Sequence, residues 1–322
     1  MLHDILIVCD GSRSGLVGRA ISGYVGSTLA KISAKGVNND YLFYFVQGKY
    51  TLLNTKKKGT GTPHLNPELL KKQKLIVPSL PEQERIVSRI EEMFSQLDAG
   101  VETLKKAKAQ LAVYRQAVLK DAFGEVPEYA LFGCISQSRL GKMLDKEKNS
   151  GKPRRYLRNI NVRWLSFDLD DLLEMRIEDY ETDKYSICKG DLVICEGGEP
   201  GRCAVWSNDE DIFYQKALHR VRFIDGSNPH FYMYYFWYAA QTGQLKPYFT
   251  GTGIKHLTGQ SLVKVPVPTA TPDLQNKIVS EIDARMSACD SIEKTVDVAL
   301  QQAEALRQRI LKDAFEGRQQ RP

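Results

Sequence analysis

Two long stretches of the chain carry apolar residues at alternating spacings of four and three. The first runs from about Glu82 to Phe123 and the second from about Asp273 to Phe315. A period of about 3.5 residues, kept over several heptads, is typical of a helix that pairs with another helix along a narrow seam. The positions that we expect in the interface are Ile86, Ile90, Leu97, Leu104, Leu111, Val118, Ile278, Ile282, Ile292, Val296, Leu306 and Ile310.

Both stretches carry the end signals of a helix. The first follows Pro81 and stops before Gly124. The second has Thr271 as a predicted N-cap and Pro272 in its first turn, which is where these residue types favour a helix start. Neither apolar stripe is wide enough to cover a globular core, so we expect the two helices to pair with each other. The alternative is that each helix packs against its own globular part.

The remaining sequence is rich in glycine, aromatic residues and short apolar runs. This pattern predicts strands and short helices packed around a core. The expected fold class is therefore α+β, with two mixed α/β domains that alternate with two long helices. The predicted boundaries are a first domain at 1–80, a helix at 81–124, a second domain at 125–271, a helix at 272–317 and a tail at 318–322.

The chain also repeats itself, with an offset between the copies of about 186 to 192 residues. Such a repeat indicates one ancestral unit used twice, with small loop insertions. The matched segments are Ile5–Gly11 with Asp191–Gly197, Tyr41–Phe45 with Tyr232–Phe236, Gly59–Leu65 with Gly251–Leu257, and Lys120–Phe123 with Lys312–Phe315.

Composition narrows the picture further. Hydrophobic residues make up 42% of the 322 residues, and the net charge of +6 permits nucleic-acid binding without demanding it. The six cysteines form no C-x-x-C pair, and we predict no metal site. No apolar run approaches the roughly 20 residues of a membrane helix. The start does not have the pattern of a signal peptide, so we expect a cytoplasmic protein without a membrane partner.

The two domain–helix junctions carry a resemblance to a known family. They read VPSLPEQERIVSRIEEMF from Val77 to Phe94 and VPVPTATPDLQNKIVSEID from Val267 to Asp283. With the glycine-bearing strand ends and Tyr156–Ile160, this order of domains and helices resembles the DNA specificity subunit of Type I restriction-modification systems. The resemblance covers nearly the whole chain.

The resemblance implies a function in recognition. Two target recognition domains would each read half of a split site on double-stranded DNA, and the helices would pair as an antiparallel coiled coil that sets their spacing. Two methyltransferase subunits would dock on the chain and bring restriction subunits indirectly. S-adenosylmethionine would bind in the methyltransferase, so this chain would hold no cofactor and would not be an enzyme.

The chain departs from the family pattern in its first domain. Residues 125–186 precede the strand of the second domain that matches Ile5–Gly11, whereas the first domain begins almost on that strand. We therefore expect a shortened first recognition domain. Either the reading frame begins inside a longer gene, which would leave a truncated and half-functional subunit, or a second specificity chain completes the domain.

Lysine and arginine on phosphates supply affinity for DNA, and Arg, Lys, Asn and Gln at base edges supply specificity. The GTG-x-x-HL segments occur in both copies, so they are better suited to scaffolding or phosphate positioning than to reading two different half-sites. We interpret His64 and His256 within them as structural. An ordinary solvated basic loop is the alternative for the charged candidates. The predicted DNA-binding residues are Arg139, Lys142, Lys152, Arg154, Arg155, Arg158, Asn159, Asn161, Arg163, Arg202, Lys216, Thr252 and Lys255.

Two rival functions remain open at this point. A methyltransferase needs a (D/N)-P-P-(Y/F) motif, and the nearest strings, Asn66-Pro67-Glu68 and Asn228-Pro229-His230, lack its second proline and its aromatic residue. The sequence also has no phosphate-binding G-x-x-x-x-G-K-[ST] loop. The other rival is a structural coiled-coil protein whose domains bind other proteins and do not read DNA.

Overall fold

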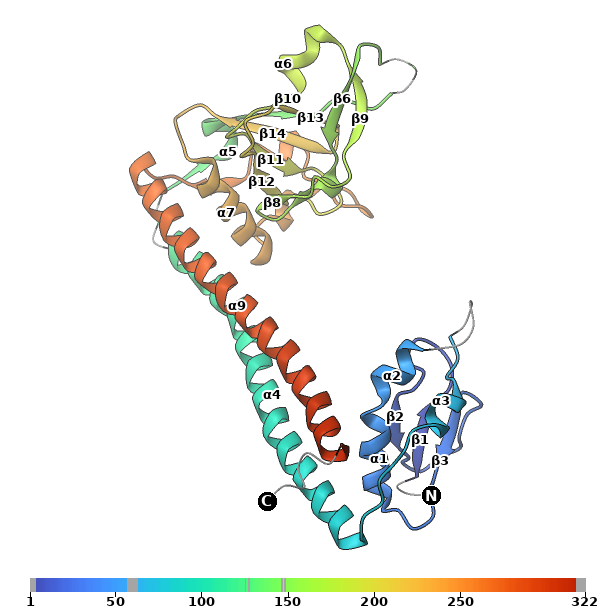
Figure 1. Ribbon diagram of the computed structural model, residues 1–322. Helices are drawn as coiled ribbons and strands as arrows, with labels where there is room; N and C mark the ends of the chain where they lie inside the picture. The colour runs from blue at the N-terminus through green and yellow to red at the C-terminus, as the bar shows by residue number, and fades with distance from the viewer. Residues whose placement is uncertain are drawn as a thin grey trace. The chain divides into compact units, whose positions relative to one another are not determined.

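A computed structural model describes residues 4–56, 63–124, 126, 128–145, 147 and 149–316. Contacts divide the chain into two compact units, residues 1–109 with 292–322 and residues 110–291. Each unit holds one globular domain and parts of both long helices, α4 (Leu80–Gly124) and α9 (Pro272–Phe315) (Figure 1). The predicted α+β class is confirmed. Residues 59–62 of the first GTG segment and the 318–322 tail lie outside the described residues.

The domain of the first unit is a small antiparallel sheet covered by helices. Its strands run in the order β2-β1-β3. The apolar face of α1 packs against this sheet and against both long helices. The elements are β1 (Ile5–Val8), β2 (Val17–Arg19), β3 (Leu29–Ile32), α1 (Asn39–Gln47), α2 (Tyr50–Thr55) and α3 (Pro67–Lys71).

The domain of the second unit contains two four-stranded sheets, ordered β12-β11-β14-β5 and β10-β13-β6-β9. Two strand pairs, β15-β4 and β7-β8, complete it. The strands are β4 (Tyr129–Leu131), β5 (Ser136–Leu140), β6 (Lys152–Leu157), β7 (Val162–Arg163), β8 (Ser166–Phe167), β9 (Leu173–Ile177), β10 (Ser186–Ile187), β11 (Leu192–Cys195), β12 (Cys203–Val205), β13 (Ile212–Tyr214), β14 (Leu218–Phe223) and β15 (Pro266–Pro268). The helices are α5 (Phe132–Ile135), α6 (Thr182–Tyr185), α7 (Pro229–Gln241) and α8 (Gly259–Leu262).

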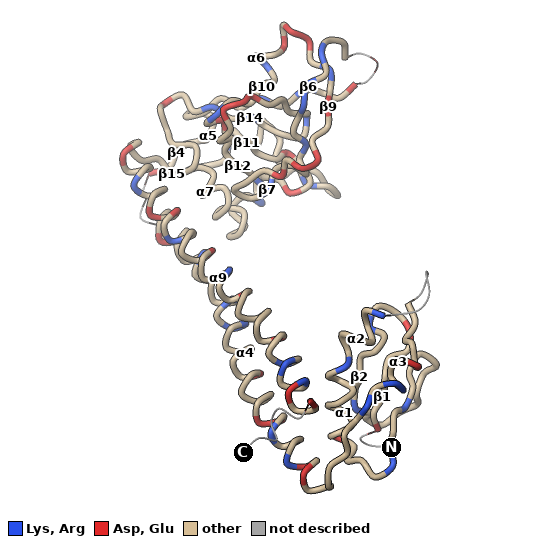
Figure 2. Tube along the Cα trace, in the orientation of Figure 1, with Lys and Arg blue, Asp and Glu red and all other residues tan. Residues whose placement is uncertain are grey.

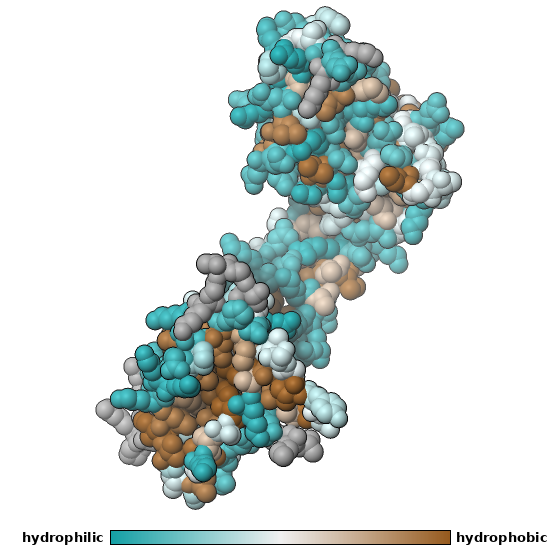
Figure 3. Space-filling model, turned by 90° about the vertical axis from the view of Figure 1, so that its right-hand side faces the viewer, coloured by the Kyte–Doolittle hydropathy of each residue, from teal (hydrophilic) through white to brown (hydrophobic). Residues whose placement is uncertain are grey.

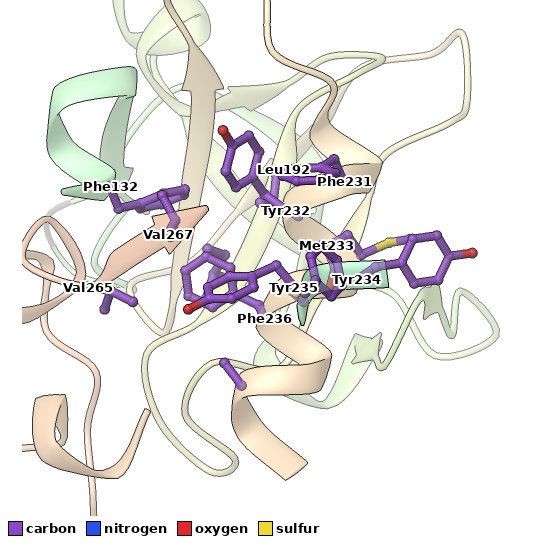
Figure 4. Close-up of a cluster of buried hydrophobic side chains, with 14 of the residues drawn as sticks. Phe132, Leu192, Phe231, Tyr232, Met233, Tyr234, Tyr235, Phe236, Val265 and Val267 are labelled. Carbon is purple, nitrogen blue, oxygen red and sulfur yellow. Dashed lines mark hydrogen bonds between the residues drawn. The ribbon is translucent and has the colours of Figure 1, made fainter. Parts of the chain in front are cut away.

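The largest core lies around α7, whose residues Phe231–Phe236 are all buried (Figure 4). A helix that is apolar on all sides needs partners on all sides. The sheet strand β11 covers one side of α7, and Phe123 from the end of α4 covers another through ring contacts with Phe231 and Tyr235. This buried aromatic helix anchors the end of a long helix.

The two copies are related as the sequence predicted, but two of the matched segments shift by one residue. Asn38 caps α1 and Asn228 caps α7, and the side chain of each accepts the backbone N–H of the residue two positions later. Tyr44 bonds Glu91 at 3.2 Å, and Tyr234 makes the equivalent bond to Asp283 at 2.5 Å. Tyr41–Phe45 therefore corresponds to Phe231–Tyr235. The predicted match of Tyr41–Phe45 with Tyr232–Phe236 was wrong, because a run of aromatic residues matches almost as well when one copy is displaced by one residue.

The strand match is displaced in the same way. Val8 exchanges backbone hydrogen bonds with Gly15 and Leu16, and Cys195 does so with Gly201 and Arg202. Val8 is therefore the structural counterpart of Cys195, whereas the match of the two sequences had paired Cys9 with Cys195. The turn that follows this strand is one residue longer in the first copy. Residues that are identical in the two sequences therefore occupy different positions along the two strand pairs.

A buried glutamine explains the junction motif of the two copies. The amide oxygen of Gln83 accepts the backbone N–H of Asn38 at 2.7 Å, and its nitrogen donates to the carbonyl of Pro78 at 2.9 Å. Gln275 makes the equivalent bonds to Asn228 and Ala270 at 2.7 and 2.9 Å. Each glutamine thus ties the start of a long helix to the start of the aromatic helix in its own domain.

Ion pairs show that α4 and α9 pack side by side in antiparallel directions. In the first unit Arg307 pairs with Asp98, and Lys108 Nζ lies 2.7 Å from Asp297 Oδ1. In the second unit Arg115 lies 2.7 Å from Asp290. Residue numbers rise along one helix as they fall along the other, so the antiparallel pairing implied by the resemblance is present.

The buried seam is narrower than the heptad pattern predicted. Six predicted positions are buried and four are partly buried, but Ile292 and Leu306 keep 50% and 46% of their surface exposed, which corrects their assignment to the closed interface. The helix ends are covered by a globular domain as well as by the partner helix, whereas the middle has the partner helix alone. The buried positions are Ile86, Ile90, Val118, Ile282, Val296 and Ile310, and the partly buried ones are Leu97, Leu104, Leu111 and Ile278.

The two domains differ at one sheet edge. In the second domain β5 pairs with β14 along that edge, whereas the described residues of the first domain place no strand beside β3, the counterpart of β14. Ile21, Tyr24 and Val25 are exposed nearby in sequence, and the face of this domain turned toward the viewer in Figure 3 carries apolar surface. That the first domain is incomplete stays a prediction. No helix in the described part of the chain is long and apolar enough to span a membrane.

Candidate nucleic-acid interface

Four loop segments of the second domain converge on one another, and we call them the loop platform: residues 157–161, 196–202, 215–217 and 250–257. The backbone N–H of Leu257 donates to Glu196 O at 2.7 Å, and that of Glu196 donates to Ala217 O at 2.9 Å. Arg202 Nη2 donates to Asn159 O at 2.8 Å. Because these bonds join all four segments, the platform can present side chains in fixed positions.

Glycines allow the closest approaches within the platform. A Cβ atom at Gly197 would lie 3.0 Å from the ring of His256, and one at Gly198 would lie 2.8 Å from the amide nitrogen of Asn159. Gly198 also has a φ of 79°, in the left-handed region that glycine tolerates best. The glycine-rich turn is thus required by packing, and recognition must come from the side chains around it.

Gln215 marks a second meeting point, where the platform joins β5 and β6. Its backbone N–H donates to Leu157 O at 3.1 Å, and Lys142 N donates to Tyr214 O at 3.1 Å. Gly141 passes so close that a Cβ there would lie 2.3 Å from Gln215 O. Sequence reasoning gave Gln215 little weight, because the crossing of three segments at one residue leaves no local signal.

Three predicted cations lie close in sequence to the segments that cross here. Arg139 stands two residues before Gly141, Arg155 stands two residues before Leu157 and Lys216 follows Gln215, and all three are exposed. Within the described residues none of them forms an ion pair with a carboxylate. An exposed cation with no internal partner is available to a phosphate group. Thr252 and Lys255 are also exposed on the platform, Asn159 is partly buried there, and Arg154 is half-buried over the ring of Phe213.

Lys142 does not belong to the interface, which corrects its prediction as a DNA-binding residue. Its side chain is buried and its ammonium group bonds both Glu178 and Glu181. Burial alone would lower the pKa of Lys142, but the two carboxylates outweigh it and raise that pKa. The bond from Lys142 holds the pKa of Glu178 down at about 2.

Three further predicted DNA-binding residues use their side chains in contacts within the domain. Asn161 is buried, and its amide nitrogen donates to Asp168 O at 3.0 Å. Arg158 pairs with Asp171 at 2.7 Å, and Arg202 pairs with Glu199 at 2.8 Å with little exposure. These side chains shape the loops, and their role as DNA contacts stays a prediction.

The acidic residues of this domain are interleaved with the basic ones (Figure 2). Arg163 is exposed but lies 3.0 Å from Asp168, whose pKa it lowers by a hydrogen bond. Lys152 is exposed and lies 3.2 Å from Asp179. Both cations would have to exchange a carboxylate for a phosphate on binding DNA, so they contribute less than Arg139, Arg155 and Lys216.

His219 supports the platform from inside the domain. It is buried on β14, and its Nε2 donates to Leu257 O at 3.0 Å. Burial lowers the pKa of His219, so the folded state holds the ring neutral. His64, in contrast, has its Nδ1 2.6 Å from Asp10 Oδ1, a carboxylate that the sequence did not place beside it. The described residues contain no group of His, Cys, Asp and Glu suited to a metal ion.

We expect acid to destabilise the protein through His219. The unfolded state takes up a proton near the ordinary histidine pKa of about 6.5, whereas the folded state resists it. Stability is therefore complete above that pH and falls as the pH drops below it, by at most about 1.4 kcal/mol per pH unit for one proton. Urea unfolding at pH 7.5 and 5.5 measures this, and H219Q should flatten the dependence. An unchanged slope in H219Q would contradict this role.

Comparison with known proteins identifies the family. The model of the type I restriction modification DNA specificity domain matches residues 3–112 and 165–302. The MjaVIII specificity subunit of Methanocaldococcus jannaschii is 31% identical over 39% of this chain and 33% of its own length. The EcoKI specificity subunit of Escherichia coli K12 is 23% identical over 82% of this chain and 62% of its own length. This chain thus spans about a third to two thirds of these two relatives.

Two solved structures share the fold. One, described as "Structural basis underlying complex assembly and conformational transition of the type I R-M system", has a TM-score of 0.79 at 17% identity and covers 97% of this chain and 81% of its own. The HsdS subunit from Thermoanaerobacter tengcongensis has a TM-score of 0.63 at 17% identity, with coverage of 98% and 81%. Since the family model covers most of the sequence, the chain belongs to the type I restriction modification DNA specificity domain family.

Proposed function

We propose that this chain is the DNA-reading subunit of a Type I restriction-modification complex and that its second domain reads one half of a split site. The observation that carries the proposal is that Arg139, Arg155 and Lys216, each within two residues of a segment that crosses at Gln215, are exposed and form no ion pair within the described part of the chain. Phosphate contacts from such a cluster would fix the position of the loop platform on a duplex. The platform side chains would then reach the base edges.

Membership of the family supports the following partners. Two methyltransferase subunits would dock on the chain and hold S-adenosylmethionine, and restriction subunits would join through them. The chain would supply recognition and no catalysis. Its pseudo-symmetric copies would match two half-sites, and a second specificity chain would complete the first domain. The complex would work in the cytoplasm, where its DNA lies.

The test is the salt dependence of duplex binding by the chain assembled with its methyltransferase subunits. Each phosphate contact adds roughly 0.9 to the slope of log affinity against log salt. The double variant R139A/K216A should lose two contacts and reduce the slope by about two. K189A removes an exposed lysine that pairs with Asp209 and should leave the slope unchanged.

Two results would count against the proposal. A slope that R139A/K216A leaves unaltered would remove the Gln215 crossing from the interface. Negligible binding by the intact complex at every salt concentration would favour the rival function, a coiled-coil module that binds proteins only.

A further inference from the structure

The two GTG-x-x-HL segments agree at every position except two. Thr62 and Pro63 stand in the first where Ile254 and Lys255 stand in the second. A residue common to both copies cannot distinguish two different half-sites, whereas a residue that differs can. If the segment contributes to sequence reading, its contribution must come from the positions of Ile254 and Lys255.

In the second domain this segment forms a hairpin with a fixed base. Thr250 and His256 exchange backbone hydrogen bonds of 2.8 and 2.9 Å. The next residue, Leu257, is buried and joined by its backbone to Glu196 and His219. The hairpin is therefore closed at its base and joined to the rest of the loop platform through Leu257.

The tip of the hairpin leaves one of the two variable side chains free. Gly251 has a φ of 94°, and the turn is so tight that a Cβ there would lie 2.3 Å from Ile254 O. Lys255 Nζ folds back and donates to Gly251 O at 2.7 Å. Ile254 instead keeps 74% of its surface exposed, and the exposed Ile160 lies on another segment of the same platform.

An isoleucine has one specific counterpart on a base edge. It can neither donate nor accept a hydrogen bond, so it cannot distinguish the polar groups of the major groove. The 5-methyl group of thymine is the apolar feature that the major groove offers, and side-chain methyl groups pack on it. Cytosine presents an amino group in place of the thymine oxygen and lacks the methyl group.

We propose that Ile254 is a specificity-determining residue that selects thymine at one position of the half-site by packing on its 5-methyl group. This inference rests on the proposed function of the second domain. Lys255 acts as a positioning residue, because its bond to Gly251 O closes the turn that presents Ile254.

The experiment uses the chain assembled with its methyltransferase subunits. The recognised sequence is first read from the pattern of methylated sites in cellular DNA. Each thymine of the half-site is then replaced in turn by uracil, which removes the methyl group and leaves base pairing unchanged. Burial of one methyl group is worth about 0.8 kcal/mol, so wild-type binding should weaken about fourfold at one position.

The variant I254A should bind the thymine duplex about as weakly as the wild type binds the uracil duplex, and it should not respond to the replacement. I224A removes another exposed isoleucine, 58% exposed in the turn after β14, and should keep the wild-type response. The inference is overturned if every uracil duplex affects the wild type and I254A alike. That outcome leaves the proposed function standing, since it requires measurable specific binding by both proteins; a complex without specific binding would overturn both.

Discussion

Replacing Val296 by aspartate is expected to lower the free energy of unfolding by about 3 kcal/mol or more, because a charge would be buried without a partner. Val296 is 5% exposed on α9, one residue before Asp297, which bonds Lys108 of α4. The carboxylate of V296D would lie in the closed part of the seam. This carboxylate would become hydrated again if the two helices separated.

I292D is the matched control for V296D. Ile292 lies one turn away on the same helix and was expected in the same seam, but half of its surface is exposed. The carboxylate of I292D would remain hydrated, so a surface effect of about 0.5 kcal/mol is expected. Urea denaturation followed by circular dichroism compares the two. Equal losses of unfolding free energy in V296D and I292D would contradict the burial of Val296 and the exposure of Ile292 in the helix pair.

The antiparallel helix pair was predictable because its signal is local and redundant. A heptad pattern repeats many times in one stretch, so the misplacement of Ile292 and Leu306 did not change the conclusion. The pattern does not reveal how many helices or domains cover each position. That number decides burial, and it depends on Phe123, Tyr41 and other residues that are distant in the sequence.

The DNA-binding side chains were harder to predict, because an arginine that meets phosphate and one that meets a carboxylate have the same local sequence. Lys142 finds Glu178 36 residues away, and Arg158 finds Asp171 13 residues away. The stretch from 139 to 163 therefore mixes available cations with cations that hold loops together. Only contacts in three dimensions separate the two kinds, and within the described part of this stretch Arg139 and Arg155 are exposed without an ion pair.

The repeated Lys-Asp-Ala-Phe segment gains a physical explanation from the same long-range contacts. Phe123 ends α4 but packs on the aromatic helix of the second domain, and Phe315 ends α9 but packs on Tyr41 and Phe45 of the first. Each domain thus binds the start of the helix that follows it and the end of the helix from the other copy. This exchange fixes both helix ends to the domain beside them.

Truncation of Phe123 to alanine should therefore have one of the largest effects in the second unit. The ring is 2% exposed and contacts Phe231, Tyr235 and Tyr238. Removing such a ring costs about 3–5 kcal/mol, from lost burial and from the cavity left behind. Loss of the ring should also raise amide hydrogen exchange at the end of α4, because that end would be released from α7.

The control for F123A is Y114A, which removes a ring from the same helix. Tyr114 is 47% exposed, so its loss should cost less than about 1 kcal/mol and leave exchange at the helix end unchanged. If F123A lowered stability while amide exchange at the end of α4 stayed slow, the ring would act as core filling alone. The anchoring of α4 by the second domain would then have to come from the backbone around β4.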